Sequence, residues 1–185
     1  MINFPWLKMN IFWWLTILSV SLSANEKTLF DINERSIVLE WVLVNDNVMG
    51  GRSFGRFEIG DESLRFTGST NTNGGGFSSI RAPLNDPSLG GFKKIRLVLR
   101  GDGREYTIVL RERRSRVSFW ATFVSEDDRW QEVVIPFNDF WPNWRGRRLD
   151  YRSIDPSAIR EIGVMIYDGK DGPFVLELRK LELIQ

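Results

Sequence analysis

The sequence predicts an all-β protein built as an antiparallel β-sandwich of the jelly-roll type. Short runs in which apolar residues recur at every second position appear along the whole chain, as expected of strands with one buried face. No run has the apolar spacing of an amphipathic helix. Clusters of Gly, Asn, Asp and Pro separate the runs at short intervals, as turns do between antiparallel strands.

Residues 1–24 differ in composition from the rest of the chain. Their single charge is Lys8, a mostly apolar run follows at 9–22, and Ser23 and Ala24 end the segment. This order is typical of a cleavable secretory signal helix, so we expect residues 1–24 to be a signal peptide and residues 25–185 to form one domain. The run is shorter than the roughly 20 residues of a spanning helix, so membrane contact is expected only if the segment is retained. We therefore expect an exported protein, periplasmic or secreted.

In the first half of the domain, each expected strand is an alternating run that ends in a turn. Residues 25–33 are polar and are expected to form an irregular lead-in. Apolar side chains at every second position from Ile37 onward predict the first strand. Turn residues such as Gly60-Asp61 separate the runs that follow. The expected strands of this half are 37–44, 54–59, 64–67 and 77–81.

The second half begins with the clearest pair of strands, which alternate on either side of Gly101-Asp102-Gly103 in the pattern of a β-hairpin. A long aromatic and basic loop is expected at 138–151. Asp155-Pro156 is expected to cap a single helical turn that reaches Arg160. The apolar phase slips at Arg179-Lys180, which predicts a β-bulge. The expected strands of this half are 93–100, 106–110, 117–123, 130–137, 162–166 and 174–183. The residues expected to share one core are Ile95, Leu97, Leu99, Tyr106, Ile108, Leu110, Phe119 and Phe123.

Composition excludes several classes of function. The chain carries 25 Lys and Arg against 24 Asp and Glu, and this near neutrality argues against a dedicated nucleic-acid binder. It contains no Cys and no His, which rules out a Ser-His-Asp triad, a thiol nucleophile and nearly every zinc or haem site. A bound metal would have to be a hard cation such as calcium, and no cofactor is predicted. Acidic residues, Glu112 among them, fall at expected turns and solvated strand positions, so no glycosidase pair is predicted.

Two stretches, 41–53 and 73–81, couple an alternating run to a cluster of Asn and Gly. Glycine lets the backbone adopt positive φ or approach a ligand closely, while Asn and Asp supply oxygens. Two interpretations stay open: a binding site, or a turn whose Asx side chains bond their own backbone. We expect the two corners to lie side by side, with Asn45, Asp46, Arg52 and Arg81 close together. If Asp46 meets Arg52 or Arg81, a buried pair would lock the corner, whereas an exposed pair would point to a ligand or partner. The candidate binding residues of these corners are Asn45, Asp46, Gly50, Gly51, Arg52, Ser53, Phe77 and Arg81.

The aromatic and basic loop adds two candidate binding residues, Trp144 and Arg145. Arginine-rich stretches at 111–116 and 145–148 could contact phosphate or anionic sugar, or could be ordinary solvated loops. Tryptophan side chains in and near the loop could stack on a sugar or a partner, or could be core aromatics. Trp120 is expected on the outward face of its strand.

Seven motifs together resemble the complex I intermediate-associated protein 30 family (NADH:ubiquinone oxidoreductase intermediate-associated protein 30). In chain order they are 45–53, 66–68, 75–81, 100–103, 136–140, 145–146 and 168–174. The resemblance spans about residues 39–183 and implies a galactose-binding-like β-sandwich similar to that of carbohydrate-binding modules. The family's mitochondrial members help to assemble respiratory complex I as chaperones and have no known catalytic residues. The N-terminus departs from this pattern, because it looks like an export signal and not an Arg- and Ser-rich transit peptide.

The sequence thus predicts a monomeric, non-catalytic binding domain whose partner is a protein or a glycan, not a nucleic acid. The resemblance favours a chaperone or assembly-factor-type protein binder similar to respiratory complex I assembly factors, exported in this case. The alternative is a carbohydrate-binding module that recognises a cell-envelope or extracellular glycan.

Overall fold

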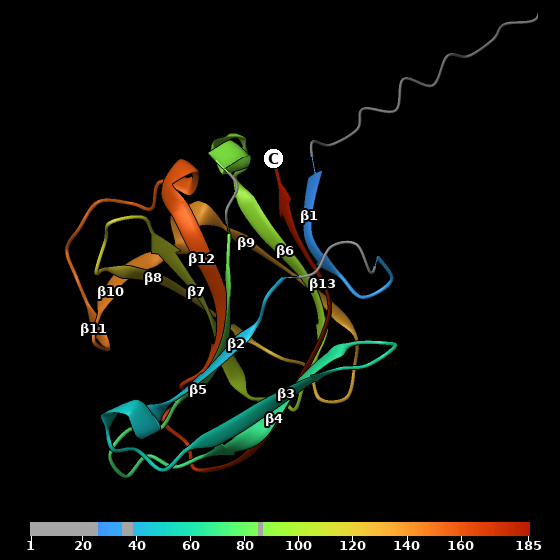
Figure 1. The fold of residues 1–185 in the computed structure, drawn as a ribbon, viewed down its shortest axis with the longest axis vertical. Helices are drawn as coiled ribbons and strands as arrows, with labels where there is room; N and C mark the ends of the chain where they lie inside the picture. Colours follow the sequence, from blue (N-terminus) through green and yellow to red (C-terminus); the bar gives the residue numbers. More distant parts are fainter. Residues whose placement is uncertain (1–25, 35–38, 85–86) are drawn as a thin grey trace, which may run out of the picture.

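The computed structural model describes residues 26–34, 39–84 and 87–185, so the expected signal segment 1–24 lies outside the described residues. The described residues form two antiparallel β-sheets that face each other across a common core (Figure 1). The predicted all-β sandwich is confirmed. Helical structure in the described residues is confined to short 3-10 turns: Asp46–Met49 (η1), Pro87–Gly91 (η2), Phe137–Asp139 (η3) and Pro156–Ala158 (η4).

One sheet has six strands and is organised around β13 (Gly172–Ile184), the last strand of the chain. The first half of β13 pairs with β4, its second half pairs with β1, and its other edge pairs with β6. Its pairing with β6 shifts register between Leu178 and Lys180, which confirms the β-bulge predicted at Arg179-Lys180. The other strands of this sheet are β1 (Glu26–Asp31), β3 (Phe54–Ile59), β4 (Leu64–Thr70), β6 (Lys94–Arg100) and β9 (Gln131–Pro136).

The other sheet has seven strands in the order β11-β10-β8-β7-β12-β5-β2. Its central strand is β7, and the neighbouring strand β12 pairs with β7 on one side and β5 on the other. The strands are β2 (Val42–Asn45), β5 (Ser78–Pro83), β7 (Glu105–Glu112), β8 (Ser118–Val124), β10 (Trp141–Trp144), β11 (Arg147–Arg148) and β12 (Ile159–Ile166).

The core lies between the two sheets and is made by the inward-facing position of each alternating strand. All eight residues predicted to share one core belong to it. Ile95, Leu97 and Leu99 enter it from the six-stranded sheet, while Tyr106 and Ile108 enter it from the seven-stranded sheet. The β-hairpin expected across Gly101-Asp102-Gly103 is therefore wrong, because this turn carries the chain from β6 in one sheet to β7 in the other.

Three segments differ from the prediction because tertiary pairing, and not local composition, makes them strands. The polar lead-in at 25–33 contains β1, which is held by its ladder to β13. Of the strand expected at 37–44, the described part is strand only from Val42. The loop expected at 138–151 contains β10 and β11, a hairpin added to the edge of β8.

Glu112 was expected at a solvated position, and the structure corrects this. Its side chain is 1% exposed, forms an ion pair with Arg152 and accepts the N–H of Asp155 at 2.7 Å. Asp155 in turn caps η4, since its Oδ1 accepts the N–H of Ser157 at 3.0 Å. The predicted cap is therefore confirmed, although the turn ends at Ala158 and Arg160 already belongs to β12.

Candidate functional site

The two Asn/Gly-rich corners lie side by side, and each carries the chain from one sheet to the other. The first joins β2 to β3, and the second joins β4 to β5 in the opposite direction. Asp46 is fully buried between them. Its carboxylate accepts backbone N–H groups from both corners, from Ser53 at 2.9 Å, Gly76 at 2.6 Å and Phe77 at 3.3 Å. One side chain therefore ties the two crossovers together.

Glycines make room for this carboxylate. A Cβ atom on Gly51 would stand 2.2 Å from Asp46 Cγ, and one on Gly75 would stand 2.4 Å from Asp46 Oδ2. Both distances are far below van der Waals contact, so each position requires the absence of a side chain. Gly50 has a different role, because it ends η1 with a φ of 87°.

Two opposing effects act on the ionisation of Asp46. Burial raises the pKa of its carboxyl, but the hydrogen bonds from Ser53, Gly76 and Phe77 outweigh this and leave the pKa below its ordinary value. Asp46 is therefore a charged group whose oxygens are already occupied by the backbone.

Neither the buried nor the exposed ion pair considered for Asp46 is found in the described residues, where backbone N–H groups are its partners. The backbone amides already surround the carboxylate, so no guanidinium is needed to offset its burial. Asn45 is engaged within the corner as well, since its Oδ1 accepts the hydroxyl of Ser78 at 2.6 Å. Arg52 is exposed and Arg81 lies further along β5, opposite Val42. The geometry favours the structural interpretation of these corners.

A different surface has the properties of a binding site: the outward face of the seven-stranded sheet. Strand register places Arg81, Gly163, Val109 and Trp120 in one row across β5, β12, β7 and β8. Val109 is only 3% exposed although it lies outside the core cluster, so neighbouring side chains on the outward face cover it. Trp120 is half-buried on this face, as expected from its strand parity.

Two arginines converge over β12 at one end of that row. A Cβ on Gly163 would stand 3.0 Å from Arg81 Cγ, so the Arg81 side chain leans across β12 where no side chain opposes it. In the adjacent row, Arg111 Nε lies 3.1 Å from Glu161 Oε1. Burial lowers the pKa of Arg81, the positive charge of Arg111 lowers it further, and Glu161 partly offsets both.

Aromatic rings connect this row to the Asp46 corner. Tyr167 follows β12 and meets Phe77 edge-to-face at 6.4 Å between ring centroids and Trp120 at 5.8 Å. Trp120 is itself oriented by a 2.8 Å hydrogen bond from its Nε1 to Ser118 Oγ. Flat rings beside guanidinium groups form a surface that can bind carboxylates and apolar groups together.

The hairpin of β10 and β11 closes one side of the face. Its two turn residues, Arg145 and Gly146, both have positive φ, as a type I′ turn requires. The turn is fastened by Asn143, whose Oδ1 accepts the N–H of Gly146 at 3.0 Å, and Gly146 lies close to the Tyr167 hydroxyl. The hairpin exposes Trp144, with the guanidinium of Arg145 5.0 Å from its ring. Arg148 lies over Trp141 at 5.4 Å.

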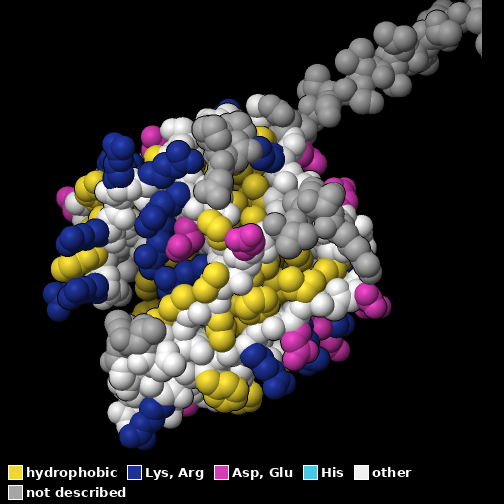
Figure 2. All heavy atoms as spheres, in the orientation of Figure 1, with side chains coloured by type: hydrophobic (Ala, Val, Ile, Leu, Met, Phe, Trp, Pro, Cys, Tyr) yellow, Lys and Arg dark blue, Asp and Glu magenta, His cyan; other side chains and the backbone are white. Residues whose placement is uncertain are grey.

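Basic side chains are concentrated on this side of the molecule. Figure 2 shows Lys and Arg gathered over the part that Figure 1 assigns to β7, β10, β11 and β12. We call this surface the arginine face; its residues are Arg81, Val109, Arg111, Trp120, Trp144, Arg145, Arg147, Arg148, Gly163 and Tyr167.

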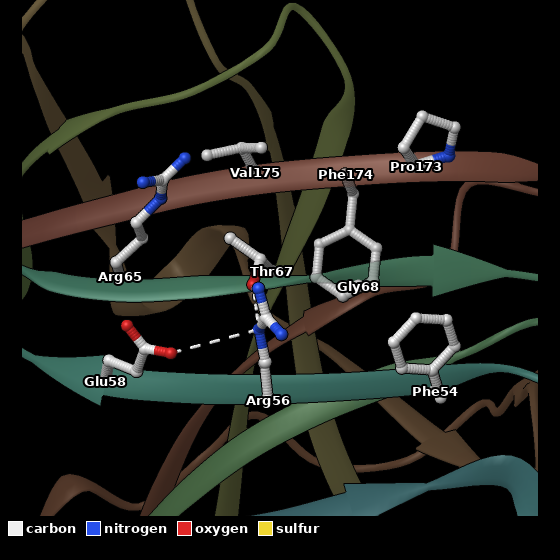
Figure 3. Close-up of a pocket in the computed structure, with 9 residues that line it drawn as sticks. All are labelled: Phe54, Arg56, Glu58, Arg65, Thr67, Gly68, Pro173, Phe174 and Val175. Carbon is white, nitrogen blue, oxygen red and sulfur yellow. Dashed lines mark hydrogen bonds and ion pairs between the residues drawn. The ribbon is translucent and has the colours of Figure 1, made fainter.

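A hollow lies on the outward face of the six-stranded sheet and has a volume of about 330 Å³ (Figure 3). Phe54 projects beside it and is 58% exposed. Arg56 there lies 3.9 Å from Glu58 and donates to Thr67 Oγ1 at 3.4 Å. Arg65 has no ion pair among the described residues, so the hollow carries one such arginine where the arginine face carries several. Its lining residues are Phe54, Arg56, Glu58, Arg65, Thr67, Gly68, Pro173, Phe174 and Val175.

Across residues 26–34, 39–84 and 87–185, no cluster of three or more His, Cys, Asp or Glu could hold a metal ion. In the same part of the chain, no helix has the length and apolarity needed to cross a membrane.

Sequence reasoning found only part of the arginine face. It named Arg81, Trp144 and Arg145, and the structure places them around one surface with Phe77 at its margin. It missed Tyr167 and gave Arg111 no individual role. The alternation of side chains along a strand could have indicated both residues, because Arg111 and Tyr167 occupy outward positions next to core residues of β7 and β12.

Comparison with known proteins gives one family. The family model for Complex I intermediate-associated protein 30 (CIA30) matches residues 30–178. "Complex I intermediate-associated protein 30, mitochondrial" of Mus musculus is 25% identical over 177 residues, which cover 82% of this chain and 54% of the mouse protein. An uncharacterized protein of Schizosaccharomyces pombe is 28% identical over 168 residues, 76% of each chain. A family 11 carbohydrate-binding module of Clostridium thermocellum shares the fold with a TM-score of 0.63, at 18% identity over 88% of this chain and 95% of the module.

These relatives correct the expected location. The mouse protein and a relative from Caenorhabditis briggsae are named mitochondrial, so the expectation of a periplasmic or secreted protein is wrong. That expectation depended on the apolar composition of residues 1–24, and composition alone does not specify a compartment. The chain spans about half the length of the mouse relative.

Proposed function

The chain belongs to the Complex I intermediate-associated protein 30 (CIA30) family, and from this premise we propose that it is a non-catalytic assembly factor that binds a protein partner during the assembly of respiratory complex I. The observation that carries the proposal is the family match itself, which extends over nearly all of the described sandwich. The mouse relative's name places that protein with an intermediate of complex I.

The arginine face supports binding in preference to catalysis. Its arginines and aromatic rings can hold a partner, but no nucleophile is placed beside a general base there. The absence of Cys and His from the sequence removes the commonest such pairs. The Asp46 corner supports the same conclusion, because its one buried carboxylate is fully bonded to the backbone.

Deletion of the gene tests the proposal. Cells that lack the protein should contain less assembled complex I on native gels, accumulate a partly assembled form, and recover when the wild-type chain is returned. The tagged protein should comigrate with the partly assembled form. Normal complex I assembly in the deletion cells would contradict the proposal.

Glycan binding is a second candidate, favoured by exposed aromatic rings on a sandwich that resembles carbohydrate-binding modules. Trp144 is 44% and Tyr151 49% exposed, and such rings can stack on sugars. One structural neighbour was determined with a β-1,3-1,4-mixed-linked tetrasaccharide. Titration calorimetry with that tetrasaccharide tests the candidate: heat that disappears in Trp144→Ala supports it, and no heat with the wild-type protein excludes this ligand.

A further inference from the structure

We propose that the arginine face binds an extended acidic segment of the protein partner, with carboxylates at the two ends of the segment and apolar side chains between them. The inference rests on the proposed function, since it specifies the chemistry of the partner that an assembly factor of this fold would hold.

Two arginines at the centre of the face, Arg81 and Arg111, have too few carboxylates beside them in the protein to balance their positive charges. Arg81 donates from Nε to Ser79 Oγ at 3.1 Å, and it takes part in none of the salt bridges of the described residues. Arg111 lies 3.1 Å from Glu161 Oε1, yet both atoms are buried and neither makes an aligned hydrogen bond. One poorly aligned carboxylate thus serves two neighbouring guanidinium groups. A further carboxylate between them would supply the missing charge and hydrogen bonds.

The opposite face of the molecule carries more complete ion pairs. On the six-stranded sheet, Arg96 pairs with Glu182 at 2.7 Å and with Glu26 at 2.9 Å, and Lys180 pairs with Glu182 at 2.6 Å. Arg100 pairs with Glu177 there. The chain therefore forms several ion pairs on this outward face, where Arg65 has none, whereas Arg81 and the hairpin arginines of the other face have none among the described residues.

The β10–β11 hairpin supplies a second group of arginines. Arg145, Arg147 and Arg148 are exposed and form no ion pairs with described residues. Arg145 lies over the ring of Trp144, and Arg148 lies over the ring of Trp141. From β5, which carries Arg81, to β11 the sheet order counts five strand spacings. At about 4.8 Å each this is roughly 24 Å along the sheet, which an extended chain covers in about seven residues.

Aromatic rings lie between the two arginine groups. Val109 in the middle of the row is covered, but the half-buried ring of Trp120 beside it meets Tyr167, which is 42% exposed. An extended segment that crosses the strands along this row would place its central side chains on these two rings. A uniform polyanion such as a nucleic acid would meet the negative charge of Glu161. The arrangement therefore favours a polypeptide that is acidic at its ends and apolar at its centre.

Fluorescence anisotropy with labelled peptides tests this inference. The probes are Glu-Asp-Leu-Phe-Leu-Asp-Glu, its neutral counterpart Gln-Asn-Leu-Phe-Leu-Asn-Gln, and a single-stranded oligonucleotide of equal charge. We expect the acidic peptide to bind the wild-type chain at least about tenfold more tightly than either other probe, with affinity that falls as salt rises.

Three variants locate the site. The double variant Arg81→Gln and Arg111→Gln should lose about tenfold or more in affinity for the acidic peptide. The variant Arg147→Gln and Arg148→Gln, on the exposed hairpin, should also lose affinity while its thermal unfolding stays unchanged, so a folding defect in the first variant does not decide the result. Arg56→Gln, on the opposite face and 72% exposed, is the matched control and should bind as the wild type does.

Several results would overturn the inference. These are equal binding of the acidic and neutral peptides, equal or tighter binding of the oligonucleotide, and equal weakening by Arg56→Gln. If a folded hairpin variant loses the peptide but restores complex I assembly in deletion cells, the acidic segment is not the assembly contact and the proposed function still stands. If deletion itself leaves complex I assembly normal, the proposed function fails whatever the peptides do.

Discussion

The backbone N–H of Gly76 donates a 2.6 Å hydrogen bond to Oδ2 of Asp46, thirty positions earlier in the chain. This bond joins the crossover that leaves the seven-stranded sheet to the crossover that returns to it. The same carboxylate holds Ser53 in the first crossover, and the Ser53 hydroxyl accepts the N–H of Asn71 in the second at 2.9 Å. The end of the sandwich is therefore held by bonds between two loops as well as by core packing.

Replacing Asp46 with Ala should destabilise the protein strongly. The N–H groups of Ser53, Gly76 and Phe77 would lose a buried acceptor, and we expect the free energy of unfolding to fall by about 3 kcal/mol or more. Urea unfolding followed by circular dichroism measures the change. Asp150→Ala, which removes an exposed aspartate, should change stability by less than about 0.5 kcal/mol. A neutral Asp46→Ala would show that the carboxylate does not hold the corner.

Adding a methyl group at Gly51 or Gly75 should have a similar but smaller effect. The new Cβ would overlap the Asp46 carboxylate, and overpacking of this kind costs about 1–3 kcal/mol. Gly91 is the matched control, because a Cβ there meets nothing within 4 Å. The midpoints of thermal unfolding of Gly51→Ala, Gly75→Ala and Gly91→Ala should therefore separate into two low values and one near wild type. Equal midpoints for all three variants would contradict the packing argument.

Arg104 should be the most sensitive arginine for stability. Its guanidinium donates to both carboxylate oxygens of Asp168, at 2.9 and 2.7 Å, and to the backbone oxygens of Lys170, Gly172 and Pro173. Arg104→Ala would leave the Asp168 carboxylate buried and unpaired, at a cost of about 3–5 kcal/mol. Arg104→Lys should recover part of this, because an ammonium keeps the charge but not the fork of donors. Urea unfolding of both variants gives the comparison. Equal stability of the Lys and Ala variants would contradict the view that a positive charge beside Asp168 stabilises the protein.

The free energy of unfolding should fall at acid pH because the carboxylates of Asp46 and Asp168 become protonated. Burial raises the pKa of each carboxyl, but hydrogen bonds to Asp46 and the Arg104 guanidinium beside Asp168 lower it more, so both folded pKa values lie below the ordinary value of 3.8. The stabilisation from each carboxylate is complete above the pKa it has in the unfolded chain and is lost as the pH falls through its folded pKa. The free energy of unfolding should therefore drop below about pH 4. As far as these two groups determine it, it should stay level from about pH 5 to 7. Urea unfolding across this range should show a shallower acid loss for Asp168→Asn than for wild type. An equal slope in both proteins would contradict the assignment.

The fold could be predicted from sequence wherever strands are long and one face is buried. Leu97 and Leu99 on β6 and Ile108 on β7, in the facing sheet, alternate cleanly because the core requires it. β1 could not be predicted in this way, since its polar residues are fixed by a ladder to β13, and Thr28 meets Glu182 across 154 positions. The β10–β11 hairpin was missed for a related reason: Trp141 and Asn143 become strand residues because β8 lies beside them.

The candidate site was predicted less well, because its chemistry depends on register across strands. The motif around Asp46 was visible in the sequence, but its partners are backbone amides, which carry no sequence signal. Arg81 was named for its closeness to that motif, whereas the structure places it over Gly163 and near Arg111. The pairing of β5, β12 and β7 that brings these residues together cannot be inferred from any one stretch of the chain.

The position of β13 has a consequence for the order in which this molecule can form. The last strand of the sequence is the common neighbour of β1, β4 and β6, so the six-stranded sheet stays in separate pieces until those thirteen residues are available. A nascent or threaded chain that stops before Gly172 can form local hairpins but cannot close its core, and contacts over such long separations form slowly. Folding should thus be a late, all-or-none event, and a chaperone that holds the incomplete chain would act on exposed strand edges from both ends of the sequence.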